Sequence, residues 1–183
     1  MYVRILSISM LALVLTLVSC KKLTDALNIT ITVPYDDAVF ITGIPGDPHV
    51  APPGLKTSLG LIKIPTNSEE IMADNQSAVD LVTSVKLSQL GIDLLLPSHQ
   101  DFTMADSIWL YVSANGGPEQ LVAYNFAVPD GKRMDMTITD AELMDVFVAD
   151  TMVFRIEGYF VKDVAYNSKI KFDMKMKVKA SLL

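Results

Sequence analysis

Cysteine and histidine are scarce in this chain of 183 residues. One Cys cannot form an internal disulfide, and two His are too few for the three-histidine zinc sites of many hydrolases. These counts argue against thiol oxidoreductases and zinc hydrolases, and the sequence gives no sign of a cofactor or a metal site. Glycine and proline, nine of each, are too few for a collagen-like or proline-rich chain.

Positive charge is in deficit as well. The chain has 15 Lys and Arg against 21 Asp and Glu, a formal net charge of −6. Nucleic-acid binding depends on neutralising phosphates with Lys and Arg, so we expect no nucleic-acid partner. Half of the residues are hydrophobic, which predicts a buried core rather than a disordered chain.

Catalytic motifs are also missing: the chain has no GxGxxG, GxxxxGK(S/T), GxSxG or HExxH. Ser98, His99 and Asp101 have the residue types of a hydrolytic triad. Neighbours on one loop do not give triad geometry, however, so we interpret them as a polar turn. Asp36, Asp37 and the turn at Asp130 could offer oxygen ligands to Ca²⁺, but without EF-hand spacing we interpret them as solvated turn carboxylates. We therefore expect a protein that is not an enzyme.

The longest uncharged apolar run lies at the start of the chain. Arg4 is followed by a run without charge from Ile5 to Val18. That run is shorter than the roughly 20 residues of a membrane-spanning helix, and it matches the apolar core of a secretion signal. It ends in Leu17-Val18-Ser19-Cys20, which resembles the lipobox of bacterial lipoproteins.

The lipobox resemblance implies a modification at Cys20. In such lipoproteins the Cys thiol accepts a diacylglycerol group, cleavage precedes the Cys, and the new amino end is acylated. The resemblance thus implies a signal peptide over 1–19, a lipid-anchored tether over 20–26 and a single domain over 27–183, with the membrane as partner through Cys20. The alternative is an ordinary secretory signal that contains a Cys by chance.

The residues after Cys20 bear on location. Lys21 is not the acidic residue that commonly retains lipoproteins in the inner membrane, and no acidic run of the surface-export type follows. The resemblance therefore implies an outer-membrane protein that faces the periplasm, with exposure at the cell surface as the alternative.

The rest of the chain alternates apolar and polar residues in short stretches separated by turn residues, which is typical of strands. We predict nine strands: Asn28–Val33, Val39–Ile44, Leu59–Ile64, Leu81–Leu96, Ile108–Ser113, Leu121–Val128, Met134–Ile138, Thr151–Val161 and Lys169–Leu182. Connections this short exclude βαβ crossovers. The pattern predicts an all-β fold, an antiparallel β-sandwich of the immunoglobulin-like or Greek-key type, with about eight or nine strands and one or two short helices.

Several local features refine this prediction. Pro34 should end the first strand, and Gly91 should mark a β-bulge where the hydrophobic alternation changes phase. Ser68 should cap a short helix through Ala73. The spacing of Thr139 and Glu142 predicts a capping box that starts a second helix through Phe147.

The last strand alternates most clearly. Its apolar positions (Ile170, Phe172, Met174, Met176 and Val178) should face the core. Its lysines (Lys169, Lys171, Lys175, Lys177 and Lys179) should then line the outer face. They could hold an anionic partner, pair with acids such as Glu157 and Asp163, or protect an edge strand from aggregation.

Three stretches carry a second resemblance: Ile71–Asn75, Asp80–Leu87 and Asp106–Ala114. They resemble a group of small Bacteroidota-type lipoproteins of uncharacterised role with a β-sandwich domain. The resemblance implies the fold and an envelope location, and no activity. Trp109 departs from the pattern, in which a polar or charged residue is expected, and this suggests an outward-facing position.

Trp109 and Tyr111 lie two residues apart on one predicted strand, so both should lie on the face opposite to Ile108, Leu110 and Val112. Exposed aromatic rings on a sheet can stack against sugars, although a covering loop is the alternative. The sequence thus predicts a non-enzymatic, lipid-anchored envelope protein, an interaction or accessory module for a glycan or another envelope protein. The second hypothesis is a glycan-binding lipoprotein of a polysaccharide-uptake system that uses Trp109 and Tyr111.

Overall fold

The structure of the chain is a computed structural model that describes residues 28–46, 56–114 and 116–182. The predicted signal peptide (1–19) and the tether (20–26) with Cys20 lie outside the described residues. Within the described ranges, no helix combines the length and the apolar character needed to cross a membrane.

The described residues form ten strands and two short α-helices. The strands are β1 (Asn28–Tyr35), β2 (Ala38–Ile41), β3 (Thr57–Pro65), β4 (Val82–Leu96), β5 (Ala105–Ala114), β6 (Gln120–Asn125), β7 (Arg133–Asp135), β8 (Thr137–Ile138), β9 (Thr151–Phe160) and β10 (Ser168–Ser181). The helices are α2 (Ser68–Asp74) and α3 (Met144–Phe147), and the 3₁₀ turns are η1 (Val79–Leu81) and η2 (Phe102–Met104).

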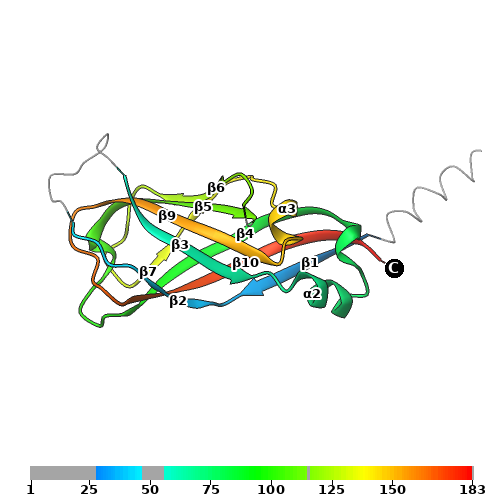
Figure 1. Cartoon of the computed structure of the whole chain (residues 1–183), viewed down its shortest axis with the longest axis horizontal. Coiled ribbons are helices and arrows are strands. Elements are labelled where there is room, and N and C mark those ends of the chain that lie inside the picture. Colours follow the sequence, from blue (N-terminus) through cyan, green and yellow to red (C-terminus); the bar gives the residue numbers. More distant parts are fainter. Residues whose placement is uncertain (1–27, 47–55, 115, 183) are drawn as a thin grey trace, which may run out of the picture.

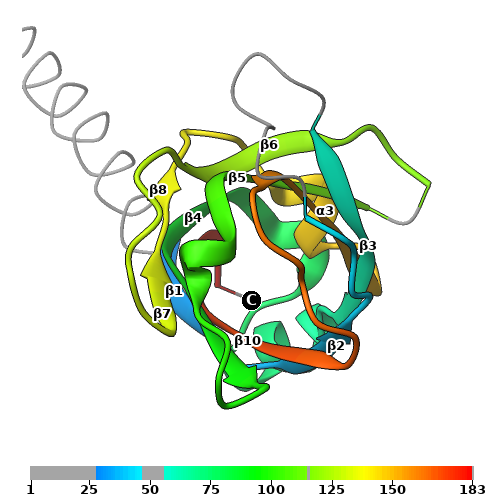
Figure 2. The same cartoon turned by 90° about the vertical axis from the view of Figure 1, so that its left-hand side faces the viewer.

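The strands form two sheets that pack face to face (Figure 1). The first sheet has the order β1-β10-β4-β7, with β2 also pairing with β10, and the second has the order β3-β9-β5-β6-β8. Every strand pair is antiparallel. Figure 2 looks along the long axis and shows β5 and β6 across the core from β1, β2 and β10. The predicted antiparallel β-sandwich is confirmed.

The core lies between the two sheets, and β10 shows why it forms there. The five apolar residues predicted to face inward are each at most 2% exposed. Phe172 among them stacks on Phe154 of β9, with ring centroids 5.4 Å apart, so one aromatic pair joins the two sheets. The 2-residue period of this strand therefore predicts which face is buried.

The edge-strand explanation for the lysines of this strand is wrong, and pairing with an acid holds only for Lys171, whose partner is Asp36. β10 is internal rather than an edge strand, because β1 and β2 pair on one side and β4 on the other. Glu157 instead pairs with Arg155 in the second sheet, and Asp163 accepts a hydrogen bond from the backbone N–H of Gly46. Neither acid neutralises a lysine of β10.

β4 contains the predicted bulge at a different residue. Lys175 pairs with Gln89 and Met176 with Leu87, so Ser88 is the extra residue that shifts the alternation. Gly91 is paired normally with Asp135 of β7. Because glycine has no side chain, Arg133 can pack over it: a Cβ atom added at Gly91 would lie only 2.5 Å from Nη2 of Arg133. Arg133 then donates to Asp93 (3.1 Å) and Asp173 (2.9 Å) across the outer face.

The bounds of several predicted strands also change. β1 continues through Pro34 to Tyr35, because β1 is at the edge of its sheet and needs no N–H on its outer side. β2 ends at Ile41, and Ile44 forms a separate antiparallel bridge with Val164. The predicted strand over residues 134–138 divides into β7 and β8, which lie in different sheets, so the count rises to ten.

Both predicted helix caps are wrong, although both short helices exist. Ser68 is buried inside α2, and Asn67 precedes it in a left-handed conformation (φ 51°) without a side-chain capping bond. Glu142 accepts hydrogen bonds from Ser84 Oγ (2.8 Å) and Val85 N (2.6 Å) of β4. The Thr139 hydroxyl donates to the carbonyl of Leu121 in β6 (2.8 Å). Thr139 and Glu142 therefore bond to the two sheets and do not form the predicted capping box.

Candidate binding surface

β5 lies between β9 and β6 in the second sheet and presents its aromatic residues outward. Ile108, Leu110 and Val112 are buried in the core, at most 3% exposed. Trp109 and Tyr111 point to the opposite face and are half-buried there. The alternation along β5 thus places both rings on one face, as the sequence suggests.

Trp109 is surrounded by other rings and by a cation. The Nζ of Lys56 lies 3.8 Å from the centre of the Trp109 ring, close enough for a cation–π interaction. Phe126 lies 5.3 Å away in a tilted arrangement, and Tyr159 contacts the ring edge-on at 5.5 Å. The indole is therefore fixed in a cluster rather than standing alone on the sheet.

Tyr124 and Phe126 extend this cluster over β6. Their rings stack with centroids 4.5 Å apart, and Phe126 is 61% exposed. We call Trp109, Tyr124 and Phe126 the aromatic surface. Its rings are held against each other, with Phe126 exposed and Trp109 and Tyr124 half-buried.

Sequence reasoning missed Tyr124 and Phe126 because the β5–β6 pairing is irregular. Tyr111 pairs with Leu121 but Leu110 pairs with Ala123, so Val122 has no partner in the register. This bulge moves Tyr124 opposite Trp109, whereas a regular hairpin would place Ala123 there. The signal that could have found Tyr124 is the aromatic pair at i and i+2 in the strand after the turn.

Tyr111 has a different environment. The Arg155 guanidinium lies 4.5 Å from the centre of its ring. Arg155 also makes a bidentate pair with Glu119, with Nε and Nη2 at 2.9 and 2.6 Å from the two carboxylate oxygens, and it pairs with Glu157. These hydrogen bonds lower the pKa of the Glu119 carboxyl and raise the pKa of Arg155. Burial, followed by the charge of Glu157, raises the pKa of Tyr111.

Chemically, this face combines exposed π-surfaces with fixed charged groups. Aromatic faces carry partial negative charge and attract the weakly positive C–H groups of a sugar ring. The carboxylates and the guanidinium beside Tyr111 supply hydrogen-bond partners for hydroxyls. The Arg155 and Lys56 cations already occupy one side of the Tyr111 and Trp109 rings, so Tyr124 and Phe126 offer the more accessible rings.

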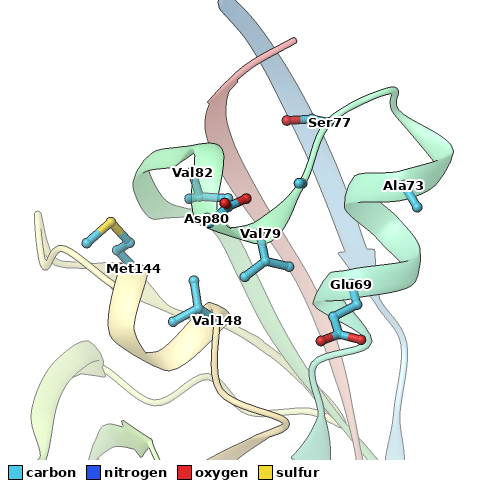
Figure 3. A pocket seen from close by; sticks show the side chains of 9 residues that line it. Glu69, Ala73, Ser77, Val79, Asp80, Val82, Met144 and Val148 are labelled. Atoms are coloured by element: carbon cyan, nitrogen blue, oxygen red, sulfur yellow. The ribbon is translucent and has the colours of Figure 1, made fainter. Parts of the chain in front are cut away.

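A hollow lies at the end of the sandwich where α2, η1 and α3 meet (Figure 3). Its volume is about 620 Å³, and most of its lining is apolar. Figure 3 shows Val79 and Val148 beside Met144, with Glu69 projecting from α2. The lining also includes the carboxylates of Glu69 and Asp80. The hollow is therefore suited to a ligand with an apolar body and a positive charge.

The Ser98–Asp101 stretch forms part of a turn that is held by its own polar groups. The Asp101 carboxylate accepts hydrogen bonds from Thr103 N (3.0 Å) and Oγ1 (2.5 Å), which lower the pKa of Asp101. Gln100 donates to the carbonyl of Asp163 (2.6 Å) and accepts from Ser168 Oγ (3.2 Å). These contacts match the polar turn expected from the sequence.

The acids considered as calcium ligands lie apart from any ligand cluster. Asp36 pairs with Lys171 (2.8 Å), and the backbone carbonyl of Asp37 accepts from Phe172 N (2.8 Å). Across residues 28–46, 56–114 and 116–182, no three His, Cys, Asp or Glu side chains gather in a metal-binding arrangement.

Comparisons with known proteins add little to this picture. No protein-family model matches the chain, and no curated protein matches it either. Among solved structures, a chain of Desmodium yellow mottle tymovirus is similar at 12% identity and a TM-score of 0.29, covering 85% of this chain and 90% of that one. A chain of turnip yellow mosaic virus is similar at 12% identity and a TM-score of 0.31, covering 85% and 82%. Likenesses this distant carry no inference about function.

Proposed function

We propose that this chain is a non-enzymatic, lipid-anchored protein of the cell envelope whose β-sandwich is an interaction module. The observation that carries the proposal is Leu17-Val18-Ser19-Cys20 at the end of the uncharged apolar run. Cys20 is the single Cys of the chain and stands at the cleavage point of the lipobox pattern. By the same resemblance, the anchor lies in the outer membrane and the domain faces the periplasm.

The test of this proposal is lipid labelling in cells. Wild-type protein should incorporate radiolabelled palmitate and fractionate with membranes, because acyl chains on one residue bury many CH₂ groups at about 0.8 kcal/mol each. Cys20→Ala should lose the label completely, while Ser19→Ala, which keeps a small residue before the Cys, should retain it. Equal labelling of wild type and Cys20→Ala would contradict the proposal.

We propose glycan binding as the second candidate function, within a polysaccharide-uptake system. The specific observation in its favour is the aromatic surface, where exposed Phe126 stacks on Tyr124 beside Trp109. Trp109 is the only Trp of the chain, so its emission reports directly on binding at this surface.

We expect a soluble polysaccharide that binds there to shift Trp109 emission, and Phe126→Ala to weaken binding about two- to tenfold through loss of one stacking ring. Tyr166→Ala is the matched control, since Tyr166 is 77% exposed and lies outside this surface. A panel of polysaccharides with no effect on Trp109 emission, or equal binding by Phe126→Ala and wild type, would count against glycan binding and leave the interaction module as proposed.

A further inference from the structure

Three lysines of β10 form an unpaired basic patch on the outer face of the first sheet. Lys177 and Lys179 are exposed and Lys175 is half-buried. We call these three the lysine triplet. Within the described part of the chain, none of them has a carboxylate within ion-pair distance, whereas Lys171 of the same strand pairs with Asp36.

The neighbouring strands supply no counter-charge to the triplet. The residues directly opposite are Pro34 and Gln89 for Lys175, Thr32 and Lys86 for Lys177, and Thr30 and Ser84 for Lys179. Lys86, opposite Lys177, carries the same charge and is itself paired with Asp140. The fold thus holds three lysines on one face that have no ion-pair partner among the described residues.

The acids farther along the same face pair with other cations, although the four carboxylates outnumber their two cations. Arg133 binds Asp93, Asp135 and Asp173, and Lys86 binds Asp140. None of these acids lies within ion-pair distance of the triplet, so its three ammonium groups remain available to an external anion.

The triplet lies at the end of the domain that leads to the anchor. β1 begins at Asn28 opposite Ser181, and Lys179 is opposite Thr30, so the triplet starts about 7 Å along the sheet from that point. Cys20 is eight residues before Asn28, a reach of at most about 28 Å. Lys21 and Lys22 directly follow Cys20 in the sequence and add positive charge next to the anchor.

From this placement we infer that the lysine triplet docks the domain against the anionic phospholipid headgroups of the bilayer that holds the anchor. The inference rests on the proposed lipid anchor. Basic residues close to a lipid anchor gain affinity from anionic headgroups within about one Debye length of the surface. The domain then lies on its first sheet, and the aromatic surface of the opposite sheet faces away from the membrane, where a partner can reach it.

The test compares lysine acetylation rates of the lipidated protein on two kinds of vesicle. One is phosphatidylcholine alone, and the other contains added phosphatidylglycerol. On the anionic vesicles, Lys177 and Lys179 should react at least about fivefold more slowly, and high salt should restore the rate. Lys63, exposed on β3 of the opposite sheet, is the internal control and should react equally on both.

A variant pair makes the test specific. Lys177→Gln with Lys179→Gln should remove the protection of Lys175 on anionic vesicles, while Lys63→Gln should leave it unchanged. Equal acetylation of the triplet on both vesicles, with the protein still floating with them, would overturn the docking inference alone. Failure to float with either vesicle would overturn the lipid anchor and the docking with it.

Discussion

Phe172→Ala is expected to lower the free energy of unfolding by about 3–5 kcal/mol. Phe172 is fully buried on β10, which lies inside the first sheet, and its ring stacks on Phe154 of the second sheet. Removing the ring leaves a cavity between two sheets that cannot close without shifting a strand. Urea denaturation of the variant and wild type measures the loss, which is a large share of the 5–15 kcal/mol typical of a domain.

Lys177→Ala is the control on the same strand. Its side chain is exposed on the outer face, so its truncation should change the unfolding free energy by no more than about 0.5 kcal/mol. If Phe172→Ala costs no more than Lys177→Ala, the assignment of the inner and outer faces of β10 is wrong.

Gly43→Ala is expected to destabilise the domain by about 1–3 kcal/mol. A Cβ at this position would lie 2.5 Å from Tyr166 N and 2.7 Å from Val164 O, and both are backbone atoms that cannot rotate away. The adjacent Ile44 exchanges two backbone hydrogen bonds with Val164 (3.0 and 2.9 Å), and the displaced chain would lose them. Thermal unfolding should show the loss as a lower midpoint.

Gly117→Ala is the matched control, because the same substitution is expected to raise the stability of the domain at that position. The nearest atom to a Cβ at Gly117 is the Ala114 carbonyl oxygen at 3.4 Å, which is tolerable. At a compatible site, Gly→Ala stabilises a protein by about 0.4–1 kcal/mol, because it lowers the conformational entropy of the unfolded chain. A stabilising effect at Gly43 would show that the segment around Ile44 does not pack against residues 164–166.

The sandwich and its strands could be predicted because period-2 alternation is a local property of the sequence. β10 is the clearest case, since each apolar residue from Ile170 to Val178 is buried and each lysine lies outside. The placement of Trp109 and Tyr111 on the outer face of β5 followed from the same period. Wherever one face is buried, the alternation specifies the register strongly.

What could not be predicted depends on contacts between distant residues. The bulge in β4 lies at Ser88, and Gly91 instead leaves room for Arg133 of β7, a contact between distant residues. Glu142 bonds to β4 instead of capping α3, since the fold places β4 within reach. Tyr124 comes opposite Trp109 only through the bulge at Val122, so the composition of the aromatic surface depends on a pairing irregularity that residue types alone do not reveal.

The two outer faces of the sandwich differ in a way that suits an anchored module. The first sheet carries the lysine triplet near the start of β1, and the second carries the aromatic surface with the Arg155 ion pairs. A protein tethered through Cys20 could thus use one face toward the bilayer and the other toward a partner. The role of the first sheet depends on the proposed lipid anchor.

The most direct test of that anchor is the intact mass of the protein extracted from cell membranes, with fragmentation of its amino end. The account predicts a chain that begins at Cys20 and carries the added mass of a diacylglycerol group and a further acyl chain. A mature chain that begins at any other residue, or one that carries Cys20 as a free thiol, would contradict it.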